Sequence, residues 1–137
     1  MAIAKTVLVS KADGAMTSIL FTLGKKDRNQ VNLSWTMNDL NINGEATADD
    51  YFDCLLQIRE IFEKTNMKIL CNGARYDVYP SRMSRQMGKG IKAYAVTMGK
   101  QAMEDSLVDI FESADLVKIG TIQQQRDYYN DWLDSLG

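Results

Sequence analysis

The first third of the chain alternates apolar and polar residues, a pattern typical of β-strands that bury one face. The alternation is strictest over residues 31–37, and two shorter β-rich runs precede it at 6–10 and 16–23. One side of the strictest run is entirely apolar and carries Val31, Leu33, Trp35 and Met37. Because polar or glycine-containing connections separate the three runs, they predict an antiparallel meander with one face open to solvent.

The apolar period changes to three or four between about residues 48 and 65, which predicts an amphipathic helix. The apolar positions of this helix are Tyr51, Cys54, Leu55, Ile58, Ile61 and Phe62. Thr47 and Asp50 resemble a capping box at its start. The next segments are predicted as a strand at 67–71, an irregular or partly helical stretch at 75–90, a strand at 91–98, a helix at 104–113 and a strand at 116–119.

A last helix is predicted over residues 122–136, with a second capping-box pattern at Thr121 and Gln124. The side expected to face the core carries Ile122, Tyr129, Trp132, Leu133 and Leu136. Together these elements predict an α+β fold, in which a mixed β-sheet begins with the antiparallel meander and is flanked by three to four helices. The 137 residues match a single globular domain over 1–137. The strand order does not follow from the pattern.

The composition changes this picture mainly by what it excludes. The chain contains no histidine, so serine triads, cysteine–histidine dyads and histidine-ligated zinc are excluded. The two cysteines, Cys54 and Cys71, lack the spacing of a metal site, and their places in a helix and a strand predict buried, reduced thiols. The N-terminus does not resemble a signal peptide, and no apolar run approaches the roughly 18 residues of a membrane span, so a cytoplasmic protein is expected.

Charge is unevenly distributed along the chain. Residues 75–100 contain six basic residues and one acidic residue, whereas residues 101–137 contain eight acidic and two basic residues. In the last helix, Asp127, Asp131 and Asp134 follow the i, i+4, i+7 spacing of one helical face. Glu112, in the acid-rich segment before the helix, extends this acidic stripe. The stripe is either a solvated face or a docking surface for a basic partner.

The basic segment at 72–90 combines glycine turns with guanidinium and hydroxyl groups, the parts of an anion site. The candidate anion-binding residues are Asn72, Gly73, Arg75, Ser81, Arg82, Arg85 and Lys89. The segment matches no phosphate-binding motif, since Gly88 and Lys89 are followed by Gly90 where a P-loop requires serine or threonine. Three interpretations remain: a crossover whose arginines pair with acidic helices, a partner or nucleic-acid surface, or a small-anion site.

Residues 39–50 place oxygen-bearing side chains, glycine and a final acid in the order of an EF-hand calcium loop. The final acid is Asp50 instead of the usual glutamate, and a strand-like run instead of a helix enters the loop. An Asn43-Gly44 turn that leads into a capped helix is therefore the favoured interpretation. No metal or cofactor is expected.

Residues 71–101 contain the blocks Cys-Asn-Gly-Ala-Arg, Tyr-Pro-Ser, Ser-Arg-Gln-Met-Gly-Lys-Gly and Met-Gly-Lys. This quarter of the chain resembles small bacterial immunity proteins, which are cytoplasmic antagonists of contact-dependent or secreted toxins. The resemblance implies a non-enzymatic protein that binds a cognate toxin, often a nuclease, and blocks its active or substrate-binding surface. It assigns no role to any single residue.

Two other functions remain open from the sequence. The first is a small phosphate- or nucleotide-binding enzyme that uses the loop at 72–90. The second is RNA binding, with Tyr76, Tyr79 and Tyr94 as stacking platforms. An isoelectric point near 5.1 argues against strong nucleic-acid binding. The pattern predicts no membrane interaction and does not determine the oligomeric state.

Overall fold

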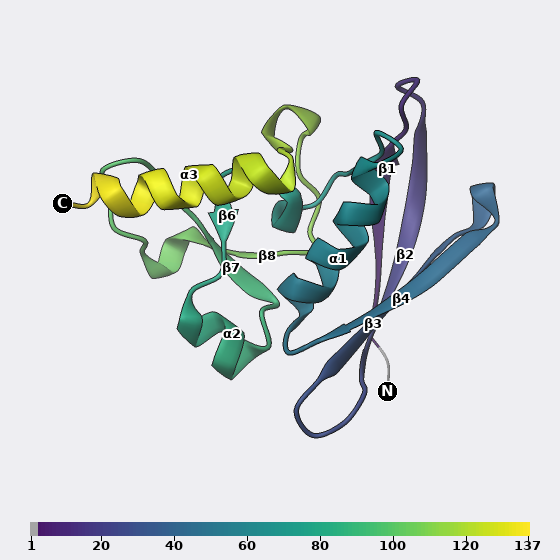
Figure 1. Cartoon of the computed structure of the whole chain (residues 1–137), viewed down its shortest axis with the longest axis horizontal. Helices are drawn as coiled ribbons and strands as arrows, with labels where there is room; N and C mark the ends of the chain where they lie inside the picture. The colour runs from purple at the N-terminus through teal and green to yellow at the C-terminus, as the bar shows by residue number, and fades with distance from the viewer. Residues whose placement is uncertain (1–2) are drawn as a thin grey trace.

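A computed structural model describes residues 3–137 and confirms the α+β class (Figure 1). The larger sheet has the strand order β4-β3-β2-β1-β5, and the smaller one the order β6-β7-β8. The larger sheet contains β1 (Ile3–Ser10), β2 (Met16–Lys25), β3 (Val31–Met37), β4 (Ile42–Ala48) and β5 (Lys68–Ile69). The smaller sheet contains β6 (Val78–Tyr79), β7 (Lys92–Ala95) and β8 (Leu107–Asp109).

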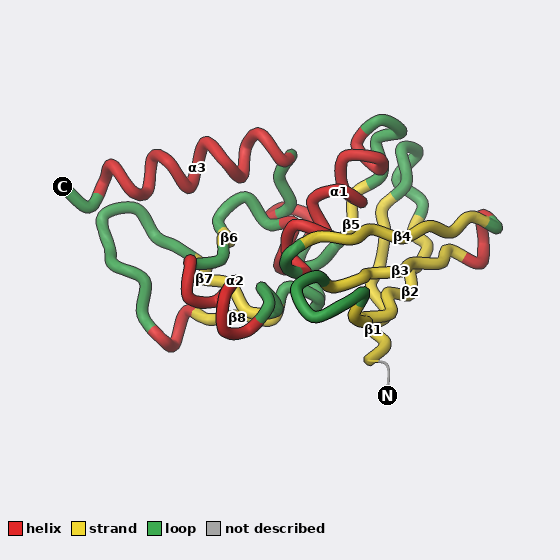
Figure 2. The backbone as a smooth tube through the Cα atoms, turned by 60° about the horizontal axis from the view of Figure 1, so that its bottom comes forward, coloured by secondary structure: helices red, strands yellow, loops and turns green. Residues whose placement is uncertain are grey.

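All strand pairs in residues 3–137 are antiparallel, so the prediction of one mixed sheet is wrong. Helix α1 (Tyr51–Glu63) does not connect two parallel strands. Instead, α1 crosses one face of the larger sheet, as Figure 2 shows, and delivers the chain to β5 at the opposite edge from β4. There β5 pairs antiparallel with β1.

The predicted meander is confirmed, with one face against the core and the other open to solvent. The apolar side of β3 is buried throughout, as the alternation predicted. The expected Asn43-Gly44 turn is wrong, because both residues lie in β4, and the chain turns earlier at Asn41, which adopts a left-handed conformation. Gly44 faces Trp35 so closely that an added Cβ would lie 2.9 Å from the indole, which explains the glycine.

Helix α1 begins later than the proposed capping box. Thr47 lies in β4, and Asp50 caps the helix by accepting a hydrogen bond from the Asp53 amide at 2.8 Å. The apolar face of α1 packs into the core, where the ring of Phe62 meets that of Trp35 edge-on at 5.1 Å. Ile61, predicted for the same face, is instead exposed.

Residues 104–119 depart most from the predicted elements. The helix expected at 104–113 is a 3-10 turn, η3 (Glu104–Ser106), followed by β8, whose apolar residues pair with β7. The strand expected at 116–119 is also a 3-10 turn, η4 (Leu116–Lys118). A short helix, α2 (Arg82–Gly88), occupies part of the segment expected to be irregular or partly helical.

Helix α3 (Ile122–Ser135) is confirmed together with its capping box. The Thr121 hydroxyl accepts from the Gln124 amide at 3.0 Å, and the Gln124 side chain accepts from the Thr121 amide at 2.8 Å. The helix extends away from the larger sheet (Figure 1), and Trp132 packs inward with 7% of its surface exposed. Leu133 is 46% exposed and Leu136 is also exposed, so the expectation that both face the core is wrong.

A continuous cluster of buried side chains joins the larger sheet, α1 and the smaller sheet. Cys54 and Cys71 lie within it as free thiols, which confirms the sequence prediction. Within residues 3–137, no helix has the combination of length and apolar character needed to cross a membrane.

We expect both thiols to be unreactive in the native protein. Burial raises the pKa of Cys54 and of Cys71 to about 11, so at pH 8 about one thiol in a thousand is ionised. A chromogenic disulfide reagent should therefore react with neither cysteine at pH 8 until denaturant is added. It should then react with two thiols per chain. Rapid release of one equivalent without denaturant would contradict this assignment.

Candidate functional site

The acidic stripe lies on the exposed side of α3. Asp127, Asp131 and Asp134 are all exposed, and none forms an ion pair with another residue in 3–137. Asp127 accepts a hydrogen bond from the Gln123 side chain at 2.8 Å, so one turn of the helix holds this carboxylate in place. Glu112 is also exposed but belongs to the loop after β8, where its carbonyl accepts from the Asn72 amide. The three aspartates thus form the stripe without it.

A groove with an aromatic floor runs beside the stripe, between η4 and α3. Asp127 and Asp131 line it together with Tyr76, Tyr128 and Val117. The two tyrosine rings meet edge-on with centroids 5.0 Å apart, and Val117 is 82% exposed. Burial, followed by the neighbouring Tyr76 and Asp77, raises the pKa of Tyr128, so its hydroxyl stays protonated at neutral pH. The groove therefore combines aromatic and apolar surface with two carboxylates that form no ion pair in the described part of the chain.

The sequence pattern predicted only some of the residues that line this groove. Tyr76 was considered as a stacking platform for RNA, whereas Tyr128 and Val117 were not singled out. Val117 belongs to a segment predicted as a strand, and it protrudes because that segment is a 3-10 turn. An isolated exposed valine beside an acidic helix carries no sequence signal.

The basic loop presents its arginines mostly to carboxylates of the same chain. Arg75 makes a two-pronged ion pair with Asp77, with both nitrogen–oxygen distances at 2.9 Å. Arg85 reaches Asp50 at 3.0 Å and Asp53 at 2.9 Å, at the start of α1. Although burial opposes protonation, the hydrogen bonds and charges of Asp53 and Asp50 raise the pKa of Arg85 above its ordinary value. Both guanidinium groups are thus already paired within the chain.

The other candidate anion-binding residues occupy different places. Asn72 and Gly73 are buried in the 3-10 turn η2 (Asn72–Ala74), where a Cβ on Gly73 would collide with Leu55 at 2.6 Å. Ser81 caps α2 by accepting from the Ser84 amide. Three of the candidates, Arg82, Arg85 and Lys89, do share one groove, and Asp49, Asp50 and Asp53 line it as well. The structure therefore does not gather the seven residues around one point.

The residues of the calcium-like pattern are likewise separated. Asp39 accepts a hydrogen bond from the Thr17 hydroxyl at 2.7 Å, whereas Asp50 caps α1 and pairs with Arg85. The strand β4 lies between them, so the segment does not form an EF-hand loop. In the part of the chain that the structure describes, no three acidic or cysteine side chains group as metal ligands.

The most elaborate polar cluster is one that sequence reasoning missed. Arg59 is 4% exposed and donates to the Gln125 side chain at 2.7 Å, to the Gly73 carbonyl at 3.2 Å and to the Gly120 carbonyl at 3.1 Å. The two amide hydrogens of Gln125 are shared in turn among the carbonyls of Gly73, Arg75 and Val78, each 2.9 Å from the nitrogen. Burial lowers the pKa of Arg59, an effect that Cys71 and Glu63 oppose. The only sequence signal is that Arg59 falls on the apolar face of its helix.

Comparison with known proteins adds no assignment: no model of a known protein family matches the chain, and no curated protein matches its sequence.

Proposed function

We propose that the chain is a non-enzymatic immunity protein that acts in the cytoplasm and neutralises a cognate bacterial toxin by covering its active or substrate-binding surface. The observation that carries this proposal is the groove beside α3, where two carboxylates that form no ion pair within residues 3–137 flank exposed aromatic and apolar surface. Interface centres are enriched in aromatic residues, and complementary charge around them accelerates association. The resemblance of residues 71–101 to immunity proteins supports the same class.

The chemistry of the groove favours a basic partner surface. A lysine or arginine side chain entering it would meet the carboxylates of Asp127 and Asp131 and could stack on the ring of Tyr128. Nuclease domains carry such basic surfaces, because they bind the phosphates of nucleic acids. A row of aspartates along α3 presents negative charge in a comparable linear array, so a nuclease toxin fits this face well.

The alternative, a phosphate- or nucleotide-binding enzyme, has less support. It needs the guanidinium groups of the basic loop to be available for a ligand, but Arg75 and Arg85 already pair with carboxylates of the same chain. Asp49, Asp50 and Asp53 would also repel a phosphate that approached Arg82 and Lys89.

The proposal predicts that removing the acidic stripe slows binding without unfolding the protein. The triple variant Asp127→Asn, Asp131→Asn, Asp134→Asn should associate with the toxin at least about tenfold more slowly at low ionic strength, because electrostatic steering is lost. Each exposed substitution should change the free energy of unfolding by less than about 0.5 kcal/mol. Surface plasmon resonance at two salt concentrations, together with survival of toxin-expressing cells, measures the effect.

We expect the neighbouring reading frame to encode the toxin, as the C-terminal domain of a large secreted protein. A matched control, Glu60→Gln, Glu104→Gln, Asp105→Asn, removes three exposed acidic charges elsewhere and should leave the association rate nearly unchanged. If the triple α3 variant binds and protects like the parent protein, α3 is only a solvated face and the proposed site is wrong.

A further inference from the structure

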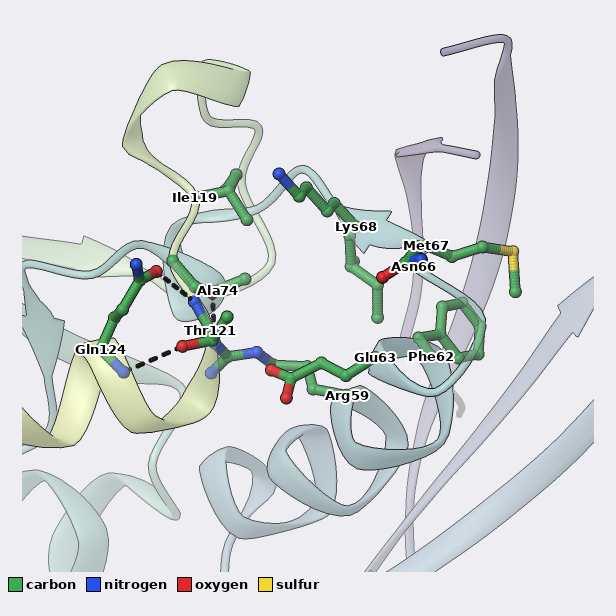
Figure 3. A pocket seen from close by; sticks show the side chains of 12 residues that line it. Arg59, Phe62, Glu63, Asn66, Met67, Lys68, Ala74, Ile119, Thr121 and Gln124 are labelled. Carbon is green, nitrogen blue, oxygen red and sulfur yellow. Dashed lines mark hydrogen bonds between the residues drawn. The ribbon is translucent and has the colours of Figure 1, made fainter. Parts of the chain in front are cut away.

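A small pocket lies between the C-terminal half of α1, the segment before β5 and the start of α3 (Figure 3). Its volume is about 220 Å³, smaller than the roughly 300–1,000 Å³ of pockets that hold drug-sized ligands. Phe62, Met67 and Ile119 provide apolar wall, whereas Arg59, Glu63 and Lys68 provide charge. A pocket of this size and lining suits a small molecule with one charged end and one apolar end.

The charge of Arg59 is only partly compensated inside the protein. Its guanidinium is buried, yet within residues 3–137 no carboxylate lies within 4.0 Å of it. Its three hydrogen bonds all go to neutral oxygens. Its Nε donates none within the described residues and is not a buried orphan, so it is open to solvent. Buried cations are normally paired with an anion, because desolvation of an unpaired charge is costly.

The nearest acidic group in the pocket is already engaged elsewhere. Glu63 stands one helical turn after Arg59, and its Oε2 accepts a hydrogen bond from the Ile122 amide at 2.8 Å. It therefore caps the first turn of α3 instead of pairing with Arg59. Lys68 is exposed at the mouth of the pocket and forms no ion pair in the described chain, and the N-terminus of α3 adds further positive potential.

We propose that this pocket binds a small organic monocarboxylate, whose carboxylate lies between Arg59 and Lys68 and whose apolar part contacts Phe62, Met67 and Ile119. The carboxylate supplies the direct ion pair that Arg59 does not make within residues 3–137, where Glu63 acts on it only from beyond 4.0 Å. An inorganic anion has no apolar part to contact the apolar wall and should therefore bind less favourably. The small volume limits the ligand to the size of benzoate or isobutyrate. This site is independent of the proposed toxin surface, and either assignment can fail without the other.

The test uses matched acids and amides on the full chain. Benzoate or isobutyrate should raise the melting temperature in a saturable way, whereas benzamide, isobutyramide and inorganic phosphate should not, since the amides lack the charge and phosphate lacks the apolar part. Titration followed by amide chemical shifts should place the largest changes at Ala74, Ile119 and Gly120, which line the pocket. No saturable effect of either acid, or equal effects of acids and amides, would overturn the proposal.

Two charge variants give a second test that does not disturb the buried arginine. Lys68→Gln removes a cation at the mouth and should weaken benzoate binding about threefold, whereas Glu63→Gln removes the repelling charge, keeps an oxygen for the Ile122 amide, and should strengthen binding about threefold. Lys92→Gln, an exposed substitution on the smaller sheet, is the matched control and should have no effect. Equal affinities in all three variants would contradict binding at this pocket.

Discussion

Replacing Gln125 with leucine is expected to lower the free energy of unfolding by about 3–5 kcal/mol, although a glutamine in an otherwise polar run looks replaceable. The side chain is completely buried and makes four hydrogen bonds, three to backbone carbonyls and one to Arg59. Leucine would leave the Val78 carbonyl and one guanidinium hydrogen without partners, whereas the Gly73 and Arg75 carbonyls would each keep one bond, from Arg59 and from the Val78 amide. Each unsatisfied buried group costs about 1–3 kcal/mol. Chemical denaturation measures the loss.

Gln123→Leu is the matched control, because Gln123 lies two residues earlier on the exposed side of the same helix and makes one surface hydrogen bond. It should change the free energy of unfolding by less than about 0.5 kcal/mol. Gln125→Glu should also destabilise, since a carboxylate still accepts from Arg59 but cannot donate to the three carbonyls. If Gln125→Leu unfolds at the same denaturant concentration as the parent, the cluster does not stabilise the fold.

The parts of the fold that were predictable are those in which a local pattern determines the structure. The alternation at 31–37 places every second side chain on one face, so the buried side of β3 follows directly. The capping box of α3 also depends on residues only three positions apart, and it appears as expected. The exposure of the aspartate stripe follows from helical spacing in the same way.

The elements that sequence reasoning missed depend on distant partners. β4 contains asparagine, glycine and small residues with weak strand preference, and it is a strand because β3 supplies a pairing edge. The acid-rich stretch at 104–113 resembles a helix, yet β7 recruits Leu107 and Val108 into β8. Non-local pairing of this kind overrides the local propensity on which the prediction rested.

The candidate sites show the same division. The stripe on α3 could be predicted because its members share one helix, whereas the groove beside it requires Tyr76 and Val117 from two other segments. The basic loop looked like an anion site because the sequence does not show that Asp77 and Asp53 would neutralise its arginines. Arg59 was overlooked for the converse reason, because its acceptors are backbone carbonyls, which no sequence pattern displays.

Replacing Trp132 with alanine is expected to cost about 3 kcal/mol, the lower end of the range for a buried aromatic residue. The indole is almost fully buried, stacks near Tyr129 with centroids 5.7 Å apart, and donates to the Lys100 carbonyl at 2.8 Å. The variant leaves a cavity and frees that carbonyl, so the C-terminal half of α3 loses its main anchor. Thermal and chemical denaturation measure the loss.

Leu133→Ala is the control for Trp132→Ala, because it makes the same change to alanine at the neighbouring, exposed position of α3. The sequence pattern placed Leu133 on the same core-facing side as Trp132, but the structure exposes almost half of its surface, so its loss should cost less than about 1 kcal/mol. Trp132→Ala should also slow association with the toxin, although it retains every carboxylate. The reason is that Asp131 and Asp134 flank Trp132, so the variant loosens the half of α3 that carries them. Equal destabilisation by the two alanine variants would show that α3 packs through a different face.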